Sequence, residues 1–175
     1  MKLIGKRSVS SVLRWFLGLA NVFVALATVI VGLVLVASVV IPDFGAGLID
    51  GLRDEAPSGE RPVVFAEHLT LLGGFFACGF TWWIINRLRR VLLSVNRGDA
   101  FEHANVNRLR AVGVGLIGIQ LTALLLAMVA PGAIGQSVGD YDFSLGSWLG
   151  ILVVFILAEV FRQGADMRDE QLTLV

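Results

Sequence analysis

Four long stretches with almost no charged residues constrain the fold of this 175-residue chain more than any other feature. A membrane hydrocarbon core about 30 Å thick needs about 20 helical residues, so each stretch can span it, the last with help from its flanks. Because lipid offers no partner to an unpaired backbone N–H or C=O group, spanning segments must be helices. The sequence therefore predicts an all-α membrane protein with four transmembrane helices in an antiparallel bundle. The predicted spans are residues 15–41, 63–86, 111–130 and 145–161.

The composition supports a membrane protein and excludes several other classes. Hydrophobic residues make up 56% of the chain and charged residues 16%, against roughly 45–50% and about 25% in soluble domains. Fourteen basic residues balance fourteen acidic ones, so we expect no direct nucleic-acid binding. We expect neither a metal site nor a cofactor, because Cys78 is the only cysteine and His68 and His103 fall on opposite predicted membrane faces. No motif of a catalytic site is present, and we expect no enzyme.

The basic residues indicate how the chain is oriented. Twelve of the fourteen lie in the N-terminal arm, in residues 87–110 or in residues 162–175. Basic residues near spans favour the cytoplasmic side, so we expect an inner hairpin (87–110), an inner tail (162–175) and both termini in the cytoplasm. The outer loops are then residues 42–62 and 131–144. We therefore expect the whole chain to form one multi-pass membrane domain.

The inner hairpin carries recognisable helix-boundary signals. Apolar residues at helical spacing predict that the second helix continues to about Asn96, and Gly98 suits a left-handed C-terminal cap. Asp99 followed by Glu102 resembles a capping box. We therefore expect a new helix that carries Phe101 and runs into the third span.

Two acidic residues lie within the predicted spans. Glu67 is either a functional intramembrane acid or a structural side chain near the outer headgroups, which snorkels to them or pairs with Arg61. Glu159 lies at the inner end of the fourth span, where an ion pair is the simpler interpretation than catalysis. Its candidate partners are Arg162 on the same helix and Arg87 or Arg90 on the second helix.

Small residues recur at four-residue spacing in several spans, a pattern that lets membrane helices approach closely. The clearest instance is Gly146 with Gly150. These faces pack the helices of one bundle or, in the fourth helix, pair two copies of the chain as a homodimer. The candidate helix-packing residues are Gly74, Gly115, Gly146 and Gly150.

Two inner segments resemble a known family. Gly98–Arg110 resembles "G-D-P-F-x-x-x-N-x-x-R-L-R", with Ala100 in place of the usual proline, and Val160–Glu170 resembles "V-F-R-x-G-x-x-L-x-x-E". Both patterns belong to a family of small bacterial four-helix membrane proteins called domain of unknown function 2975. The chain end only approximates the family's closing Thr-Val. The matching candidate residues are Gly98, Asp99, Phe101, Asn105, Arg108, Leu109, Arg110, Phe161, Arg162, Gly164, Glu170 and Thr173.

The resemblance implies a non-catalytic protein that docks a soluble cytoplasmic partner such as a helix-turn-helix transcription regulator, because members of the family look like partners of such regulators. Two alternatives stay open. One is a small-solute transporter or channel component, with Glu67, His68 and Gln120 as polar lining. The other is a structural subunit of a membrane complex.

The motif residues also have purely local interpretations. Phe101 could bury against Leu92 or Val95, and Gly164 could cap the fourth helix. The two arginines Arg108 and Arg110 would then only contact anionic headgroups, a contribution of about 1 kcal/mol each.

Overall fold

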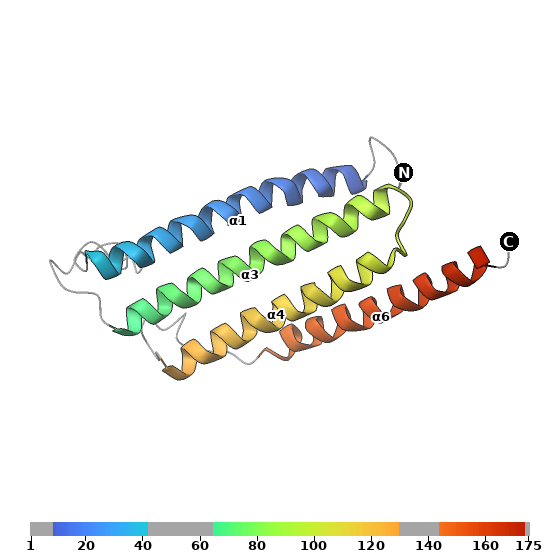
Figure 1. Ribbon diagram of the computed structural model, residues 1–175. Helices are drawn as coiled ribbons and strands as arrows, with labels where there is room; N and C mark the ends of the chain where they lie inside the picture. Colours follow the sequence, from blue (N-terminus) through green and yellow to red (C-terminus); the bar gives the residue numbers. More distant parts are fainter. Residues whose placement is uncertain (1–8, 42–64, 130–143, 174–175) are drawn as a thin grey trace. The chain divides into compact units, whose positions relative to one another are not determined.

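The described part of the chain consists of helices and turns, without strands. The computed structural model describes residues 9–41, 65–129 and 144–173. Its helices are α1 (Val9–Val40), α3 (Phe65–Asn96), α4 (His103–Val129) and α6 (Leu145–Thr173) (Figure 1). The prediction of an all-α protein with four long helices is confirmed. Most residues of the two predicted outer loops lie outside the described ranges.

All four helices are long and apolar enough to cross a membrane. At most 17% of the most apolar window of each helix is buried inside the structure, so large apolar side chains such as Phe23 and Leu33 of α1 are exposed. A soluble protein does not leave apolar faces of this extent in water, whereas lipid covers them. The chain is therefore a multi-pass membrane protein. The antiparallel order and the cytoplasmic hairpin stay predictions.

The chain divides into two compact units. Unit 1 contains α6 together with α1 up to Phe23, α3 from Phe80 and α4 up to Ile117. Unit 2 contains the remaining parts of α1, α3 and α4. The core of unit 1 is formed by Val91, Leu109, Ala158, Val95 and Phe161, and that of unit 2 by Leu71, Val34 and Leu35.

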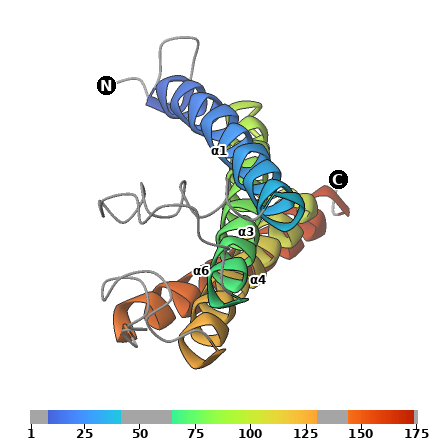
Figure 2. The same cartoon turned by 90° about the vertical axis from the view of Figure 1, so that its left-hand side faces the viewer.

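Glycines bring the helices of unit 1 together. A Cβ atom at Gly113 of α4 would lie 2.7 Å from the ring of Phe155 in α6, and one at Gly115 would lie 2.8 Å from Ile84 in α3. Two faces of α4 thus contact α3 and α6 directly, and α4 runs beside both (Figure 2). A larger residue at either glycine would force the helices apart.

In unit 2, α3 contacts both α1 and α4. The ring of Phe75 lies over Gly32 of α1, and Leu126 of α4 fills the space beside Gly73. His68 contributes a polar link, with Nε2 at 3.3 Å from the backbone oxygen of Ser38. Unit 2 thus combines apolar packing on both sides of α3 with the buried polar side chains Ser38, Glu67 and Thr70.

Candidate functional site

The turn after α3 has the geometry of a Schellman motif. Gly98 adopts a φ of +85°, a left-handed conformation that favours glycine. The N–H of Asp99 donates to the backbone oxygen of Ser94 at 3.1 Å, and that of Gly98 donates to Val95 at 3.0 Å. These bonds satisfy the last carbonyl groups of α3, which ends at Asn96. The predicted helix end and glycine cap are confirmed.

The side chain of Asn105 stabilises this turn through hydrogen bonds. It is completely buried, and its amide donates to the hydroxyl of Ser94 and to the backbone oxygen of Ala100, the latter at 2.9 Å. The Ser94 hydroxyl in turn donates a hydrogen bond to the backbone oxygen of Asp99 at 2.6 Å. The Asn105 side-chain oxygen accepts from Arg108 at 2.7 Å. Both ends of the amide are thus satisfied in the interior.

The start of the next helix differs from the prediction. α4 begins at His103, so the expected capping box at Asp99 and Glu102 is wrong and Phe101 precedes the helix. The physical reason is a contact distant in sequence. The Asp99 carboxylate pairs with Arg168 of α6, and the backbone oxygens of Asp99 and Ala100 accept hydrogen bonds from Ser94 and Asn105, so residues 99–102 stay in a turn.

Phe101 projects from the turn onto α6. Its ring contacts Gly164, where a Cβ atom would lie 2.7 Å from Cε1, and its centroid is 5.4 Å from that of Phe161. Since α6 continues to Thr173, the interpretation of Gly164 as a helix cap is wrong. The glycine makes room for the ring. Phe101 is still 45% exposed, so it does not bury against the end of α3 as the local interpretation required.

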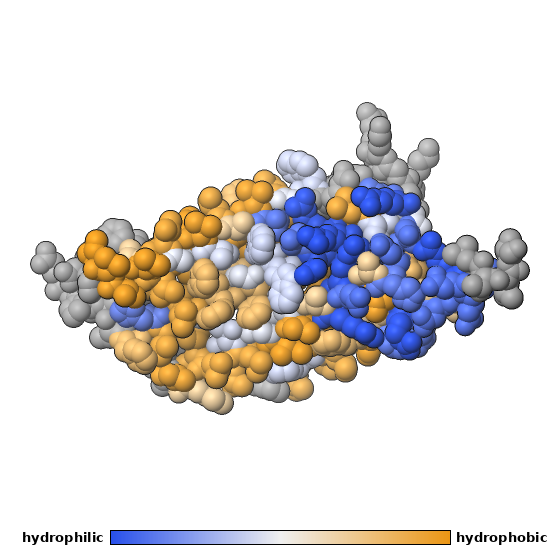
Figure 3. Space-filling view, in the orientation of Figure 1, coloured by the Kyte–Doolittle hydropathy of each residue, from blue (hydrophilic) through white to orange (hydrophobic). Residues whose placement is uncertain are grey.

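Polar contacts reinforce this packing between the start of α4 and the end of α6. His103 Nε2 lies 3.1 Å from Asp169 and 3.9 Å from Asp166, beside the Asp99–Arg168 pair. Hydrophilic side chains gather over this end of unit 1 (Figure 3). We call the arrangement the turn–tail clamp: residues 97–103 held against residues 161–169. Among the described residues, no group of three or more metal-ligating side chains has the geometry of a metal site.

Glu159 of α6 forms ion pairs with one arginine of its own helix and one of α4. Its carboxylate accepts from Arg162 Nε at 3.0 and 3.1 Å, so the predicted local pair is confirmed. The inter-helix partner is Arg110 of α4, at 3.8 Å, rather than Arg87 or Arg90. α4, not α3, presents its basic side chain to this face of α6.

The two motif segments therefore meet in space. Leu109 lies in the core shared with Ala158 of α6, and Arg108 lies 3.5 Å from Glu102. Glu170 is exposed near the end of α6, and the side chain of Thr173 lies outside the described residues. No sequence pattern singles out Ser94 or Arg168, because an ordinary helical serine and a tail arginine do not point to a distant partner.

The glycines proposed for helix packing have different environments. Gly115 contacts Ile84 closely, and Gly74 lies at ordinary van der Waals distance from Val31. Around Gly150 there is open space, and a Cβ at Gly146 would meet only the Ser144 hydroxyl at 3.6 Å. The clearest small-residue pair is thus not used to pack the described helices against each other.

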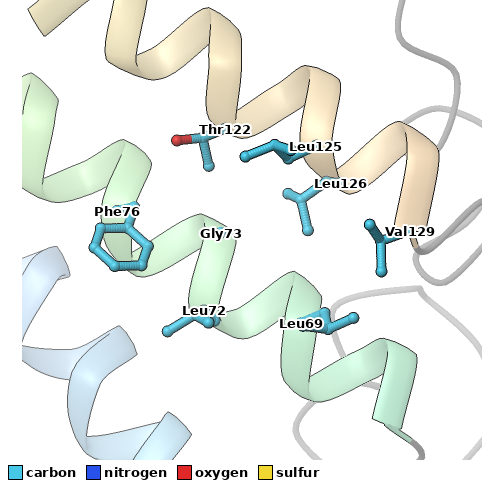
Figure 4. A pocket seen from close by; sticks show the side chains of 8 residues that line it. All are labelled: Leu69, Leu72, Gly73, Phe76, Thr122, Leu125, Leu126 and Val129. Carbon is cyan, nitrogen blue, oxygen red and sulfur yellow. The ribbon is translucent and has the colours of Figure 1, made fainter.

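Unit 2 contains three buried polar side chains, Ser38 of α1 and Glu67 and Thr70 of α3. Glu67 is 2% exposed, unlike a side chain that snorkels to the surface, and Arg61 lies outside the described residues. A groove of about 280 Å³ lies between α3 and α4 (Figure 4). Thr122 is its only polar lining side chain, and its hydroxyl donates to the backbone oxygen of Gly118 at 2.8 Å. The groove is therefore apolar.

The fold and the clamp define a multi-pass membrane protein with four candidate spanning helices in the described ranges and a polar end built by two sequence motifs. The profile of the family described as "Protein of unknown function (DUF2975)" matches residues 10–174. The chain belongs to this family, as its motifs indicated. Searches of curated proteins and of solved structures found no match.

Proposed function

We propose that this chain is a non-catalytic protein of the bacterial inner membrane that docks a soluble cytoplasmic regulator on the turn–tail clamp. The regulator would be of the helix-turn-helix class that the family resemblance implies. Held at the membrane in this way, the regulator would be kept from DNA. The chain itself needs no nucleic-acid site for this role.

The observation that carries the proposal is exposed apolar surface at the polar end of unit 1. Phe101 is 45% exposed and Met167 is 60% exposed. Met167 follows Gly164, the contact point of Phe101, by three residues, so it lies on the same side of α6. Aromatic and methionine side chains are enriched at protein–protein interfaces relative to the rest of a protein surface.

The length of α6 argues that lipid does not cover this surface. α6 has 29 residues, whereas about 20 suffice to cross the hydrocarbon core. The remaining turns carry Arg162, Asp166, Arg168 and Asp169, which favour water over hydrocarbon. Met167 is therefore expected outside the hydrocarbon core, within reach of a soluble partner.

The rigidity of the clamp also supports docking. The turn is held by the buried amide of Asn105, by the packing of the Phe101 ring on Gly164, and by the ion pair between Asp99 and Arg168. A surface that is already ordered loses less conformational entropy when a partner binds.

A photo-crosslinking amino acid placed at Met167 tests the proposal in living cells. We expect a covalent adduct whose protein component mass spectrometry identifies as a helix-turn-helix regulator. The same amino acid at Met128, an exposed residue of α4 in unit 2, is the control and should give no such adduct. Absence of the regulator from the Met167 adducts, or equal capture at Met128, contradicts the proposal.

A second candidate function, passage of a small solute, is favoured by one observation, the burial of Glu67 within a candidate span. Ionisable groups at such positions often mark a pathway. On this alternative, Glu67→Gln abolishes solute flux into liposomes that contain the protein. Flux that is unchanged, or absent from the wild type, rejects it.

A further inference from the structure

A second groove, in unit 1, differs from the apolar one described above because it contains an arginine. It has a volume of about 450 Å³ and lies between the first turns of α1 and the last turns of α3. Its lining residues are Trp15, Gly18, Leu19, Val22, Arg89 and Leu93. A Cβ at Gly18 would meet no atom within 4 Å, so the glycine helps to keep the groove open.

Arg89 has unused hydrogen-bonding capacity. Its Nε is buried, and no described group accepts a hydrogen bond from it. A buried donor without a partner is costly. Such an atom in the wall of a groove leaves room for an acceptor from outside the described residues.

The acids of unit 1 do not supply this acceptor. The ion pairs between described side chains in this unit join acids to bases of α4 and α6. On α3, Arg87 instead stacks on Trp83, with 5.6 Å between its Cζ and the ring centroid. The basic end of α3 is thus a region of positive charge that the described acids leave uncompensated.

We propose that this groove binds one anionic phospholipid, with its phosphate on Arg89 and an acyl chain along Leu19 and Val22. A guanidinium pairs well with a phosphate oxygen, and basic pockets between membrane helices at the cytoplasmic side suit anionic headgroups. Trp15 is of the type that anchors at the membrane–water boundary, so the groove joins the headgroup level to the hydrocarbon region. The inference is independent of the proposed docking function.

Native mass spectrometry of the full chain in detergent tests this site with phosphatidylglycerol and phosphatidylcholine as probes. The wild type should retain one phosphatidylglycerol and prefer it to phosphatidylcholine. Loss of one charge-assisted hydrogen bond should weaken phosphatidylglycerol binding about tenfold in Arg89→Gln. Arg90→Gln, which changes an exposed arginine that does not line the groove, is the matched control and should bind at least several times more tightly than Arg89→Gln.

A second pair of variants tests the groove while Arg89 keeps its charge. Gly18→Leu fills the groove and should lose the lipid, whereas Gly150→Leu, at an equally open glycine of α6, should keep it. Circular dichroism confirms that each variant retains its helices. The proposal is overturned if both probes bind equally, if Arg89→Gln or Gly18→Leu binds like its control, or if inorganic phosphate alone displaces the lipid and so reveals a free-phosphate site.

Discussion

At the residue scale, the buried side-chain amide of Asn105 is fully hydrogen-bonded. Asn105 links the end of α3, the turn and the start of α4 through hydrogen bonds to Ser94, Ala100 and Arg108. A buried polar group that loses its partner costs about 1–3 kcal/mol. Removal of this amide would leave the Ser94 hydroxyl and the Ala100 carbonyl without a donor.

We therefore expect Asn105→Ala to lower the free energy of unfolding by about 2 kcal/mol. Asn107→Ala, at an exposed position two residues along the same helix, is the control and should change it by less than about 0.5 kcal/mol. Denaturation of the detergent-purified protein, followed by circular dichroism, measures both. Equal stability of the two variants would show that the buried network contributes little.

At the element scale, the position of α6 depends on contacts with the turn as well as on its apolar face. Gly164 accepts the Phe101 ring, while Arg168 pairs with Asp99. The ion pair is partly exposed, so it contributes only about 0–1 kcal/mol. Packing of the ring should therefore dominate the docking of the last turns of α6.

Gly164→Leu should release the end of α6 from the turn, because its side chain would occupy the space of the Phe101 ring. Overpacking of this kind costs about 1–3 kcal/mol. Hydrogen exchange of residues 162–171 should become faster, and Gly150→Leu, in open space, should leave it unchanged. Adding Phe101→Ala to Gly164→Leu should restore part of the protection; no restoration would mean that the ring is not the obstacle.

At the scale of the whole molecule, a net charge of zero conceals a strong separation of charge along the chain. The segments predicted to be inner carry twelve basic residues, whereas the predicted outer loops carry two. This distribution predicts that the turn–tail clamp faces the cytoplasm. It also predicts that the groove beside Arg89 opens toward the inner leaflet.

Cysteine labelling in cells tests this orientation. With Cys78→Ser as background, an impermeant maleimide applied to spheroplasts should label Ser58→Cys in the predicted loop 42–62. It should label Asn107→Cys only after the membrane is permeabilised. The reverse pattern of labelling would place the clamp outside and remove the basis for a cytoplasmic partner.

Features that depend only on neighbouring residues could be predicted from the amino-acid sequence. The four helices follow from uncharged stretches of spanning length, and the end of α3 follows from Gly98, whose φ of +85° is a local requirement. The family motifs are likewise read directly from consecutive residues. Each of these features needs no knowledge of where another helix lies.

Only the tertiary structure decided which helix faces meet. Membrane helices are apolar nearly all round, so apolar periodicity does not specify how each one is rotated. For this reason the partner of Glu159 across helices is Arg110 rather than an arginine of α3, and Asp99 meets Arg168 instead of capping α4. The same rotation leaves Arg89 in the wall of a groove and Gly150 in open space.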